Sequence, residues 1–498
     1  YRCRCEKMCD IFKIRNGTPE IQYSQVRISI QITNDFERNE KMKKRICALL
    51  LGICILLTLA ACSTAGTENE TEAKKPTSGA NDAAPAEKAD DTAKTGEPVT
   101  ITYYTWETTE QSNPVWDEIL EKYNIKVDVC ILPDTGGADK ESALDIVAMS
   151  GSEMDFRIIT GTQAASRVQK GFALDLTDLI AKYDINMEDL FGKYAGEGLI
   201  RFDGVYYGIP VRANEKMWFY NKTIFDELGL DYPQDGWTWD EYYALADKIT
   251  EMSDYYGTAT NAHPGMWYYN GLLQGGQFFD ENGKFVMYED EYLIDSLRQY
   301  KRMDDEGVKP SFVSMRSRNA YISTEFLSGK CAMAEGFPYI LRDMRLPDQF
   351  PFDFEVGVVT PPVNAKGATC YSCGDVQFLA INPASEHADE AFLAMVYYMQ
   401  YGAKYMTNMS VPPLAEADDS IIEAFVADTP ISLEDGKKFF NPDMQFINSQ
   451  PFGAYPNGVE YQALMNEEAE VYLTGGQDLD TTIANIRARS LAIEASAK

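Results

Sequence analysis

An alternation of strand and helix patterns from residue 99 onward constrains the fold of this 498-residue chain more than any other feature. Residues 99–104 favour a strand, residues 113–123 continue with helical spacing, and residues 125–129 favour a strand again. The sequence further predicts a strand over 156–159 and helices over 141–150, 164–169 and 176–183. Strands that alternate with helices predict a parallel sheet wound by crossovers. About 400 residues of this pattern exceed one hydrophobic core, so we expect two lobes.

An apolar run upstream of this region predicts export. Met-Lys-Lys-Arg at 42–45 precedes about a dozen apolar residues and the sequence Leu-Ala-Ala-Cys62. This arrangement is typical of a secretory signal, whereas a spanning helix needs ~20 apolar residues. The Leu-Ala-Ala-Cys ending resembles the lipobox of bacterial lipoproteins, which implies a diacylglyceryl group on Cys62. We therefore expect residues 42–61 to be a signal peptide, and the protein to lie outside the cytoplasm with a lipid anchor in the cell membrane.

The segments on either side of this signal do not read as folded protein. Residues 1–41 show no clear periodicity and would place an export signal inside the chain, so we interpret them as a translated upstream leader. The codons for residues 37–39 can spell a ribosome-binding sequence; a genuine N-terminal extension is the alternative. Residues 63–97 contain no Val, Ile, Leu or aromatic residue. They cannot bury a core, so we expect 62–97 to be a lipidated cysteine followed by a disordered tether.

Charge and cysteine content exclude several functions. The chain has 45 Lys and Arg against 77 Asp and Glu, a net charge of −32, which repels phosphate backbones, so we expect no nucleic-acid partner. Cys370 and Cys373 have the spacing of a zinc or redox pair, but a second pair is missing and His263 and His387 are the only histidines. We therefore expect no metal and no cofactor, with the two thiols either free or joined in one local disulfide.

Nine segments between residues 204 and 399 occur in an order that is specific as a set. They are Gly204–Pro210, Met217–Lys222, Ile224–Leu230, Trp237–Glu241, Phe326–Met333, Glu335–Phe337, Gly357–Pro362, Asp375–Ile381 and Ala384–Met399. In this order they resemble the extracellular solute-binding proteins of ABC importers, the sugar-binding family that includes maltose-binding protein. The resemblance extends over nearly all of residues 99–498.

This resemblance implies an α/β, two-lobed periplasmic-binding-protein-like fold (type II). Each lobe would be a mostly parallel sheet flanked by helices, with a hinged cleft between them. The N-lobe would comprise 98–211 and 376–410, and the C-lobe 212–375 and 411–498. The implied function is the substrate-binding subunit of an ABC transporter, which captures a carbohydrate such as an oligosaccharide and delivers it to the transmembrane permease. We expect a monomer that is not an enzyme.

Several of these segments also have a local physical interpretation. Gly204 and Gly208 suit a tight hairpin that ends at Pro210. Thr238 is a candidate N-cap with Glu241 three residues on, which predicts a capping box. The sequence Asp-Glu-Asn-Gly at 280–283 predicts a hairpin turn and not a calcium loop, because the alternating ligand pattern is missing.

Sugars present apolar faces edged by hydroxyls, so a sugar site combines aromatic platforms with carboxylates, amides and arginines. Open α/β sheets bind ligands beyond the carboxyl ends of their strands, which favours residues at strand ends and in interlobe loops. The candidate ligand-binding residues are Trp106, Glu107, Gln163, Arg212, Asn214, Trp218, Trp267, Tyr268, Phe337, Ser372, Asp375 and Tyr455. Phe337 and Tyr455 are included because relatives carry aromatic platforms there. Core packing is an equal interpretation for Trp218, and for the apolar loop that contains Trp267 and Tyr268.

Two other functions remain open from the sequence. A secreted glycoside hydrolase could use two carboxylates, for example Glu107 and Asp375, if they lie ~5 Å apart (retaining) or ~6.5–9.5 Å apart (inverting). A sugar receptor could instead pass its closure to a membrane sensor kinase. An aromatic-rich cleft does not choose among oligosaccharides, polyols and other solutes.

Overall fold

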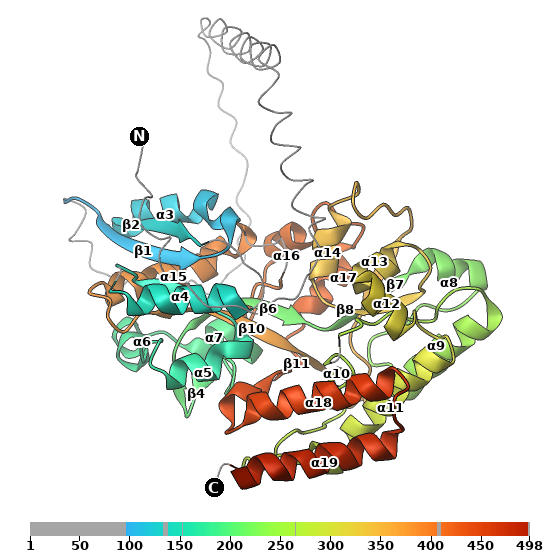
Figure 1. Ribbon diagram of the computed structural model, residues 1–498. Helices are drawn as coiled ribbons and strands as arrows, with labels where there is room; N and C mark the ends of the chain where they lie inside the picture. Colours follow the sequence, from blue (N-terminus) through green and yellow to red (C-terminus); the bar gives the residue numbers. More distant parts are fainter. Residues whose placement is uncertain (1–95, 133–137, 152, 264, 406–409, 497–498) are drawn as a thin grey trace, which may run out of the picture. The chain divides into compact units, whose positions relative to one another are not determined.

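The computed structural model describes residues 96–132, 138–151, 153–263, 265–405 and 410–496 (Figure 1). These residues belong to one compact unit of the chain. The predicted leader, signal peptide, Cys62 and the tether as far as residue 95 lie outside the described residues. In the described part of the chain, no helix combines the length and apolar character needed to cross a membrane.

The larger of two main sheets has six strands among the described residues, in the order β11-β10-β3-β1-β2, with β6 paired to β10. Its strands are β1 (Val99–Thr105), β2 (Ile125–Ile131), β3 (Phe156–Ile159), β6 (Ile209–Glu215), β10 (Tyr371–Ile381) and β11 (Gln445–Asn448). The pairs β1–β2, β1–β3 and β10–β11 are parallel, as the alternating pattern predicts. The pairs β10–β3 and β10–β6 are antiparallel.

The smaller sheet differs from the predicted mostly parallel arrangement. Its strands are β7 (Met217–Asn221), β8 (Met333–Gly336) and β9 (Val356–Val359), in the order β8-β7-β9. Both pairings with the central β7 are antiparallel. The strands β8 and β9 therefore run in the same direction, joined by a helical crossover as the alternation predicts. The pattern cannot show that β7, which follows β6 after one residue, inserts between them in the opposite direction.

Helices and one short hairpin complete the described fold. Helix α15 packs on β1, β6 and β10 and against α3, whereas α13 packs on β8 and α17 on β9, and the C-terminal helices α18 and α19 lie side by side (Figure 1). The helix bounds are α3 (Val115–Tyr123), α4 (Ala138–Met149), α5 (Ala164–Gln169), α6 (Thr177–Tyr183), α7 (Met187–Phe191), α8 (Lys222–Leu228), α9 (Trp239–Met252), α10 (Tyr269–Leu273), α11 (Glu291–Asp305), α12 (Phe312–Arg318), α13 (Ile322–Leu327), α14 (Tyr339–Met344), α15 (Ala388–Gly402), α16 (Asp419–Val426), α17 (Leu433–Lys437), α18 (Gly458–Leu473) and α19 (Leu479–Ser496).

The strand β7 lies between two hydrophobic clusters and contributes to both. Met217 and Phe219 join the cluster that contains the buried side chains of the larger sheet, and Trp218 and Tyr220 join a second, aromatic-rich cluster. Successive side chains of a strand point to opposite faces, which is why this buried strand feeds both clusters in alternation. The expectation of more than one hydrophobic core is confirmed, because the structure has two such clusters and both include side chains of β7.

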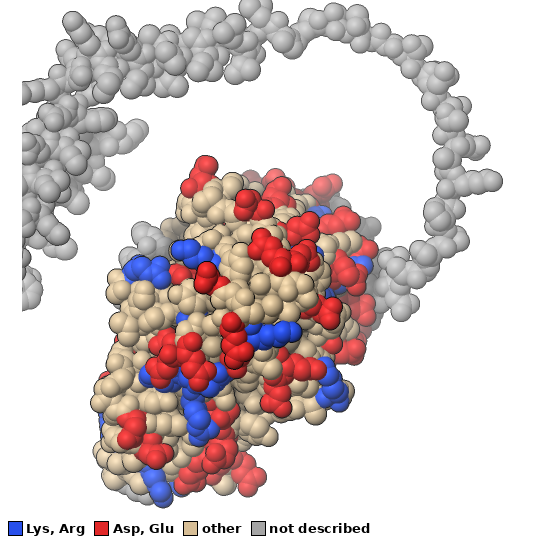
Figure 2. All heavy atoms as spheres, turned by 90° about the vertical axis from the view of Figure 1, so that its right-hand side faces the viewer, with Lys and Arg blue, Asp and Glu red and all other residues tan. Residues whose placement is uncertain are grey.

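Acidic side chains cover more of the surface in Figure 2 than basic ones do, in agreement with the net charge of −32. They are interspersed with basic residues instead of forming one continuous field on this face. Such a surface keeps a protein soluble and repels polyanions.

The predicted hairpin at Gly204, the 280–283 turn and the cap form, but the hairpin ends at Tyr206 and Pro210 lies inside β6. A hairpin joins β4 (Arg201–Phe202) to β5 (Val205–Tyr206), with Asp203 and Gly204 at φ 53° and 79°. Positive φ at both central residues is the geometry of a type I′ turn, which glycine adopts without strain. The 280–283 turn closes through the Gly283 N–H, which donates to the Asp280 carbonyl at 2.9 Å. In the described residues, no group of three or more His, Cys, Asp and Glu is arranged to hold a metal ion.

The capping box at the start of α9 is confirmed. The Thr238 hydroxyl accepts from the Glu241 N–H at 3.3 Å, and the Glu241 carboxylate accepts from the Thr238 N–H at 2.7 Å. Two amide groups that the first helical turn leaves without an intrahelical partner are thereby satisfied.

We predict that Thr238→Ala lowers the free energy of unfolding by about 1 kcal/mol, because the side-chain oxygen of the cap is lost. Urea denaturation followed by circular dichroism measures this change. Thr238→Ser keeps the oxygen and serves as the control, with an expected change near zero. Equal losses in both variants would contradict the capping interpretation.

Candidate functional site

A cleft of about 740 Å³ is lined by residues from both main sheets and their loops. One wall is polar and comes from β6, β10 and the segment after β1. The rest of the lining comes from α10, α13, α14 and the segments beside them; it carries several aromatic rings and also the charged residues Arg342 and Asp343. The lining side chains used below are Glu107, Arg212, Asn214, Met266, Tyr269, Tyr321, Phe337, Tyr339, Asp375, Gln377, Ser410 and Gln450.

The antiparallel pairing of β6 with β10 builds the polar wall. Arg212 lies opposite Gln377, and Asn214 lies opposite Asp375. Within each strand the two residues are two positions apart, so all four side chains share one face of the sheet. This face is the one that borders the cleft.

Arg212 is fixed by two carboxylates. Its guanidinium lies 2.9 Å from the Glu107 carboxylate and 3.1 Å from that of Glu110, which is buried. The Tyr398 hydroxyl donates to the same Glu110 oxygen at 2.8 Å. Burial alone would lower the pKa of Arg212, but the neighbouring Glu107, Tyr398 and Glu110 raise it, so the side chain stays cationic.

The second polar pair presents amide and carboxylate groups to the cleft. The Asn214 side-chain amide donates to Asp375 at 2.9 Å, and the Ser410 hydroxyl donates to the Asn214 side-chain oxygen at 3.3 Å. The Gln377 Oε1 atom is buried and has no hydrogen-bond partner within the part of the chain that the structure describes. A buried acceptor without a partner costs free energy, which a hydroxyl donor from a ligand would recover.

Three rings form the aromatic wall around Phe337. The ring centroids of Tyr269 and Tyr339 each lie 5.9 Å from that of Phe337, with interplanar angles of 82° and 23° respectively. The Asn261 side-chain amide donates to the Tyr339 hydroxyl at 2.6 Å, and the Gln450 amide donates to that of Tyr269 at 3.4 Å. Burial raises the pKa of Tyr269 to about 12, so its hydroxyl stays protonated.

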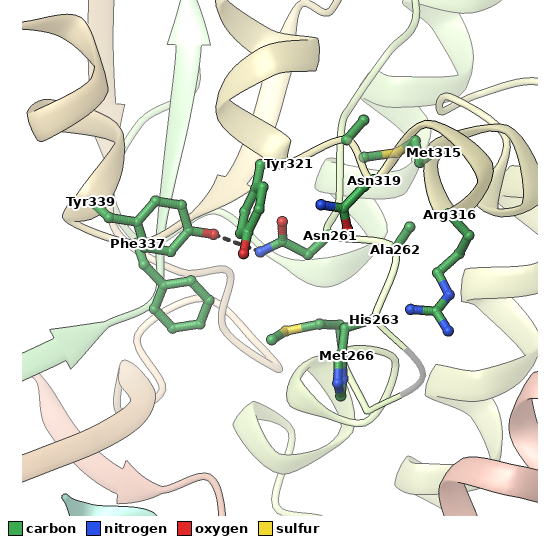
Figure 3. A pocket seen from close by; sticks show the side chains of 11 residues that line it. Asn261, Ala262, His263, Met266, Met315, Arg316, Asn319, Tyr321, Phe337 and Tyr339 are labelled. Atoms are coloured by element: carbon green, nitrogen blue, oxygen red, sulfur yellow. Dashed lines mark hydrogen bonds between the residues drawn. The ribbon is translucent and has the colours of Figure 1, made fainter. Parts of the chain in front are cut away.

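A smaller side pocket of about 260 Å³ adjoins this cleft (Figure 3). The side pocket and the cleft share four lining residues, which are Met266, Tyr321, Phe337 and Tyr339. Phe337 and Tyr339 therefore border both spaces. In Figure 3 the rings of Phe337 and Tyr339 lie across the pocket from Arg316. The figure also shows the hydrogen bond between Asn261 and Tyr339.

Five of the residues predicted from the sequence line the cleft together: Glu107, Arg212, Asn214, Phe337 and Asp375. Four of them belong to the polar wall, where the criterion of strand ends and interlobe segments selects them. Phe337, which was predicted from the family resemblance, belongs to the aromatic wall.

Four predicted aromatic residues are core side chains in this structure. Trp218, Trp267 and Tyr268 are almost completely buried in the aromatic-rich cluster. Trp218 packs edge-on against Trp237, Trp239 and Tyr242, as the alternative interpretation of this residue required. Trp106 is 5% exposed and lies behind the polar wall, where its indole N–H donates to the Glu107 carboxylate at 3.0 Å.

The remaining three predicted residues also lie outside the cleft lining. Ser372 is fully buried, and its hydroxyl donates to the Lys216 carbonyl at 3.0 Å. The Gln163 side chain accepts from Arg167 at 2.9 Å. Tyr455 stacks on Phe279 with ring centroids 3.8 Å apart and lines a different hollow, beside η8 (Pro451–Ala454).

Sequence reasoning missed Tyr269, Tyr339, Gln377 and Gln450. A signal was present for Gln377, because it lies two residues after Asp375 on one predicted strand and therefore on the same face. Tyr269 directly follows the predicted residues Trp267 and Tyr268. The sequence does not show which of these three aromatic side chains faces the cleft, because that depends on where α10 begins. Tyr339 and Gln450 carry no comparable pattern.

Cys370 and Cys373 form no disulfide, which resolves the alternative left open by their spacing. Cys373 points into the core near the Tyr269 carbonyl, whereas the Cys370 thiol donates to the Pro361 carbonyl. Burial raises the pKa of Cys370 to about 11 and that of Cys373 to about 12. Neither thiol is therefore activated as a thiolate at neutral pH.

Two connected sheets and a cleft lined from both define a two-lobed α/β ligand-binding protein. Residues 80–404 match the model of the family "bacterial extracellular solute-binding protein", and the chain belongs to this family. The resemblance inferred from the sequence is thereby confirmed.

Individual relatives agree with this assignment. The chain is 33% identical over 92 residues to the arabinooligosaccharide-binding protein of Halalkalibacterium halodurans, a match that covers 18% of this chain and only a fifth (20%) of that protein. A sugar transporter from Rhizobium etli in an open conformation shares the fold with a TM-score of 0.65 and 18% identity, over 80% of this chain and 99% of that one. An ABC substrate-binding protein from Listeria monocytogenes in complex with cycloalternan gives a TM-score of 0.61 and 20% identity, over 80% and 99%.

We predict that Arg212→Met lowers the free energy of unfolding by about 3 kcal/mol, because Glu110 would remain buried without its cation. Arg298→Met is the matched control, since Arg298 pairs with Asp295 on the surface, with side chains 49% and 41% exposed. Its expected loss is below about 1 kcal/mol. Chemical denaturation of both variants at one pH compares them, and similar small losses would show that the Arg212 cluster does not stabilise the fold.

Proposed function

We propose that this protein is the lipid-anchored substrate-binding subunit of an ABC importer. It captures an oligosaccharide in the cleft and delivers it to the transmembrane permease subunits. It works outside the cytoplasm as a monomer, is attached through Cys62 after removal of the 42–61 signal, and requires no cofactor. The observation that carries the proposal is the pairing of a polar wall with an aromatic wall across one cleft.

The chemistry of the two walls suits a sugar. Phe337 and Tyr269 are only 6% and 4% exposed, and with Tyr339 they line the cleft, so the accessible part of these three rings is the apolar surface against which a C–H face of a sugar ring could pack. The opposite wall offers carboxylate, amide and guanidinium groups for the hydroxyls around the ring. The buried Gln377 oxygen adds an acceptor that a hydroxyl would satisfy.

The names of relatives support the same class of ligand. The relative from Halalkalibacterium halodurans is an arabinooligosaccharide-binding protein, and a second relative, 33% identical over 109 residues, is the multiple sugar-binding protein of Streptococcus mutans. The Listeria monocytogenes protein is an ABC substrate-binding protein in complex with cycloalternan.

Delivery would depend on closure of two lobes around the ligand. The proposed lobe boundaries, between 211 and 212 and between 375 and 376, fall inside β6 and β10, which pair with each other. A ligand that contacts both lobes, for example Glu107 or Gln377 of one and Phe337 of the other, stabilises the closed form by its higher affinity for that form. The tether between Cys62 and residue 97 would keep the binding unit near its permease.

The hydrolase alternative has less support from the site. Glu107 forms an ion pair with Arg212 at 2.9 Å, so one of the two carboxylates that a hydrolase would use is already held by a cation of the protein. Asp375 accepts a hydrogen bond from Asn214 and would serve as a binding group in the same way. A receptor for a sensor kinase would use the same cleft, and copurification of the membrane partner distinguishes it from an importer subunit.

The deciding experiment titrates the purified protein with a panel of mono- and oligosaccharides and follows both heat and products. Saturable binding with intact sugar recovered supports the proposal. A ligand present at 100 times its Kd should also stabilise the protein by about 2.7 kcal/mol in a thermal-shift assay. Cleavage of the sugar would reject the proposed binding subunit in favour of the hydrolase. No binding by any saccharide would reject the binding subunit and the hydrolase alike.

We predict that Phe337→Ala weakens binding of the best sugar in that panel by on the order of tenfold or more, because a stacking face of about 1–1.5 kcal/mol is removed. Tyr292→Ala is the control, since Tyr292 is an exposed aromatic residue (47%) outside the cleft lining. Isothermal titration calorimetry measures both. Unchanged affinity in Phe337→Ala would contradict its role as a platform.

The anchor is tested separately in cells. We predict that Cys62→Ser moves the protein from the membrane fraction to the medium or periplasm, because serine cannot form the thioether to the diacylglyceryl group. Immunoblots of the fractions, with Cys130→Ser as the control, measure the shift. Continued membrane association of Cys62→Ser would contradict lipid anchoring at this residue.

A further inference from the structure

Arg212 is a polar-wall residue whose position depends on groups outside the cleft. It lines the cleft, with a side chain that is 11% exposed. Its Nη1 atom pairs with Glu107 at 2.9 Å and its Nη2 atom with Glu110 at 3.1 Å. A guanidinium has five N–H donors, so these two partners leave donors for the hydroxyls of a ligand. The direction of these donors depends on how firmly the two carboxylates are held.

Glu110 lies in η2 (Thr108–Ser112) and is held by a tyrosine of α15. Its Oε1 atom accepts both from Arg212 at 3.1 Å and from the Tyr398 hydroxyl at 2.8 Å. Glu110 and Tyr398 are buried, and neither is among the described residues that line the cleft. Burial raises the pKa of Tyr398, and the nearby Glu110 raises it further, so its hydroxyl keeps the proton that it donates.

Trp116 of α3 fixes both members of this buried pair. Its indole N–H donates to the Glu110 backbone carbonyl at 2.7 Å. Its ring stacks on that of Tyr398, with centroids 4.9 Å apart and an interplanar angle of 4°. One side chain at the contact between α3 and α15 therefore holds the backbone of Glu110 and the ring of Tyr398 together (Figure 1). The Tyr398 hydroxyl is thus presented to the Glu110 carboxylate by groups that are themselves packed in place.

The second partner of Arg212 is more accessible. The Glu107 side chain is 23% exposed and lines the cleft, so the hydroxyls of a ligand can compete with Arg212 for its oxygens. The Glu110 carboxylate is 2% exposed and is not open to that competition. The buried bond to Glu110 is therefore the contact that can keep Arg212 in place while a ligand binds.

We propose that Tyr398 and Glu110 are positioning residues of the sugar site, which fix the direction of the remaining Arg212 donors and so make the cleft discriminate between sugars that differ in the configuration of one hydroxyl. Neither residue touches the ligand. This inference rests on the proposed function and adds to it the residues outside the cleft that determine specificity. A freely rotating guanidinium would follow the hydroxyls of many sugars. A held one replaces the hydrogen bonds to water only for hydroxyls in matching positions.

Calorimetric titration of the full protein with epimers tests this proposal. The probes are the best-binding saccharide of the panel and its single-hydroxyl epimers, together with glucose and galactose and with cellobiose and lactose. In the wild type, the affinities within the best-bound set should differ by on the order of tenfold or more. Tyr398→Phe, which keeps the stacked ring and removes only the hydroxyl, and Glu110→Gln should each reduce this ratio by about fivefold.

Tyr183→Phe is the matched control, because it removes the same kind of bond from the same helix. The Tyr183 hydroxyl donates to Asp389 of α15 at 2.9 Å, and its ring stacks on Phe392 of α15. Tyr183 is not among the described residues that line the cleft, and its substitution should leave the affinity ratio unchanged.

The affinity ratio separates positioning from a merely structural role. A variant that only destabilises the fold weakens all epimers by the same factor and keeps the ratio. A smaller ratio in Tyr398→Phe and Glu110→Gln, with Tyr183→Phe unchanged, supports the positioning role. An unchanged ratio in either variant, or a wild type that binds all epimers equally, would overturn this role while sugar binding itself stands. A wild type that binds no saccharide would overturn the proposed function and the positioning role together.

Discussion

The antiparallel pairing of β6 with β10 is the constraint on which the rest of the molecule depends. It joins a strand that leads directly into the smaller sheet to a strand at the centre of the larger one, where β10 also pairs with β3 and β11. The same register places Arg212 opposite Gln377 and Asn214 opposite Asp375 on one face. A slip of β6 by one residue would turn Arg212 and Asn214 away from the face that carries Asp375 and Gln377, because strand side chains alternate with period two. The site is therefore specified by backbone pairing before any side-chain interaction is considered.

Two buried charges fix the connection between the sheets. Glu215, the last residue of β6, accepts from the Tyr194 hydroxyl at 2.9 Å and pairs with Lys193 at 2.7 Å. The next residue, Lys216, donates to Glu335 at 2.8 Å and to Asn270 at 2.7 Å. Neighbouring side chains point in opposite directions, so each charge finds its partner on a different side of the chain. Glu335 lies two residues before Phe337, and Asn270 follows Tyr269. The Lys216 cluster thus ties the end of the polar wall to the elements that carry the aromatic wall, and loss of either partner would leave a charge buried alone.

The sequence predicted the features that depend on local patterns. The alternation of elements, the tight hairpin at Gly204, the capping box at Thr238 and the polar residues at strand ends all follow from periods of two or 3.6 and from turn chemistry. It failed where tertiary packing decides. The antiparallel insertion of β7 depends on long-range pairing, and Trp218, Trp267 and Tyr268 are buried because an aromatic cluster closes over them. Nothing local distinguishes a tryptophan that serves as a platform from one that fills a core, since both bury a large apolar surface.

The polar wall is already hydrogen-bonded without a ligand, and this affects how it can select one. Arg212 is held by Glu107 and Glu110, and Asn214 by Asp375 and Ser410. Under the proposed function, a sugar hydroxyl would have to fit the remaining lone pairs and N–H groups, or replace a bond that the protein makes with itself, so these contacts would add little net free energy. Their benefit is preorganisation: groups that do not reorder on binding cost less conformational entropy. A ligand whose hydroxyls miss these directions loses its bonds to water without recovering them. Under the proposed function, the aromatic rings would supply attraction to any sugar with a suitable C–H face, while the rigid polar wall would discriminate among sugars that pack equally well on these rings.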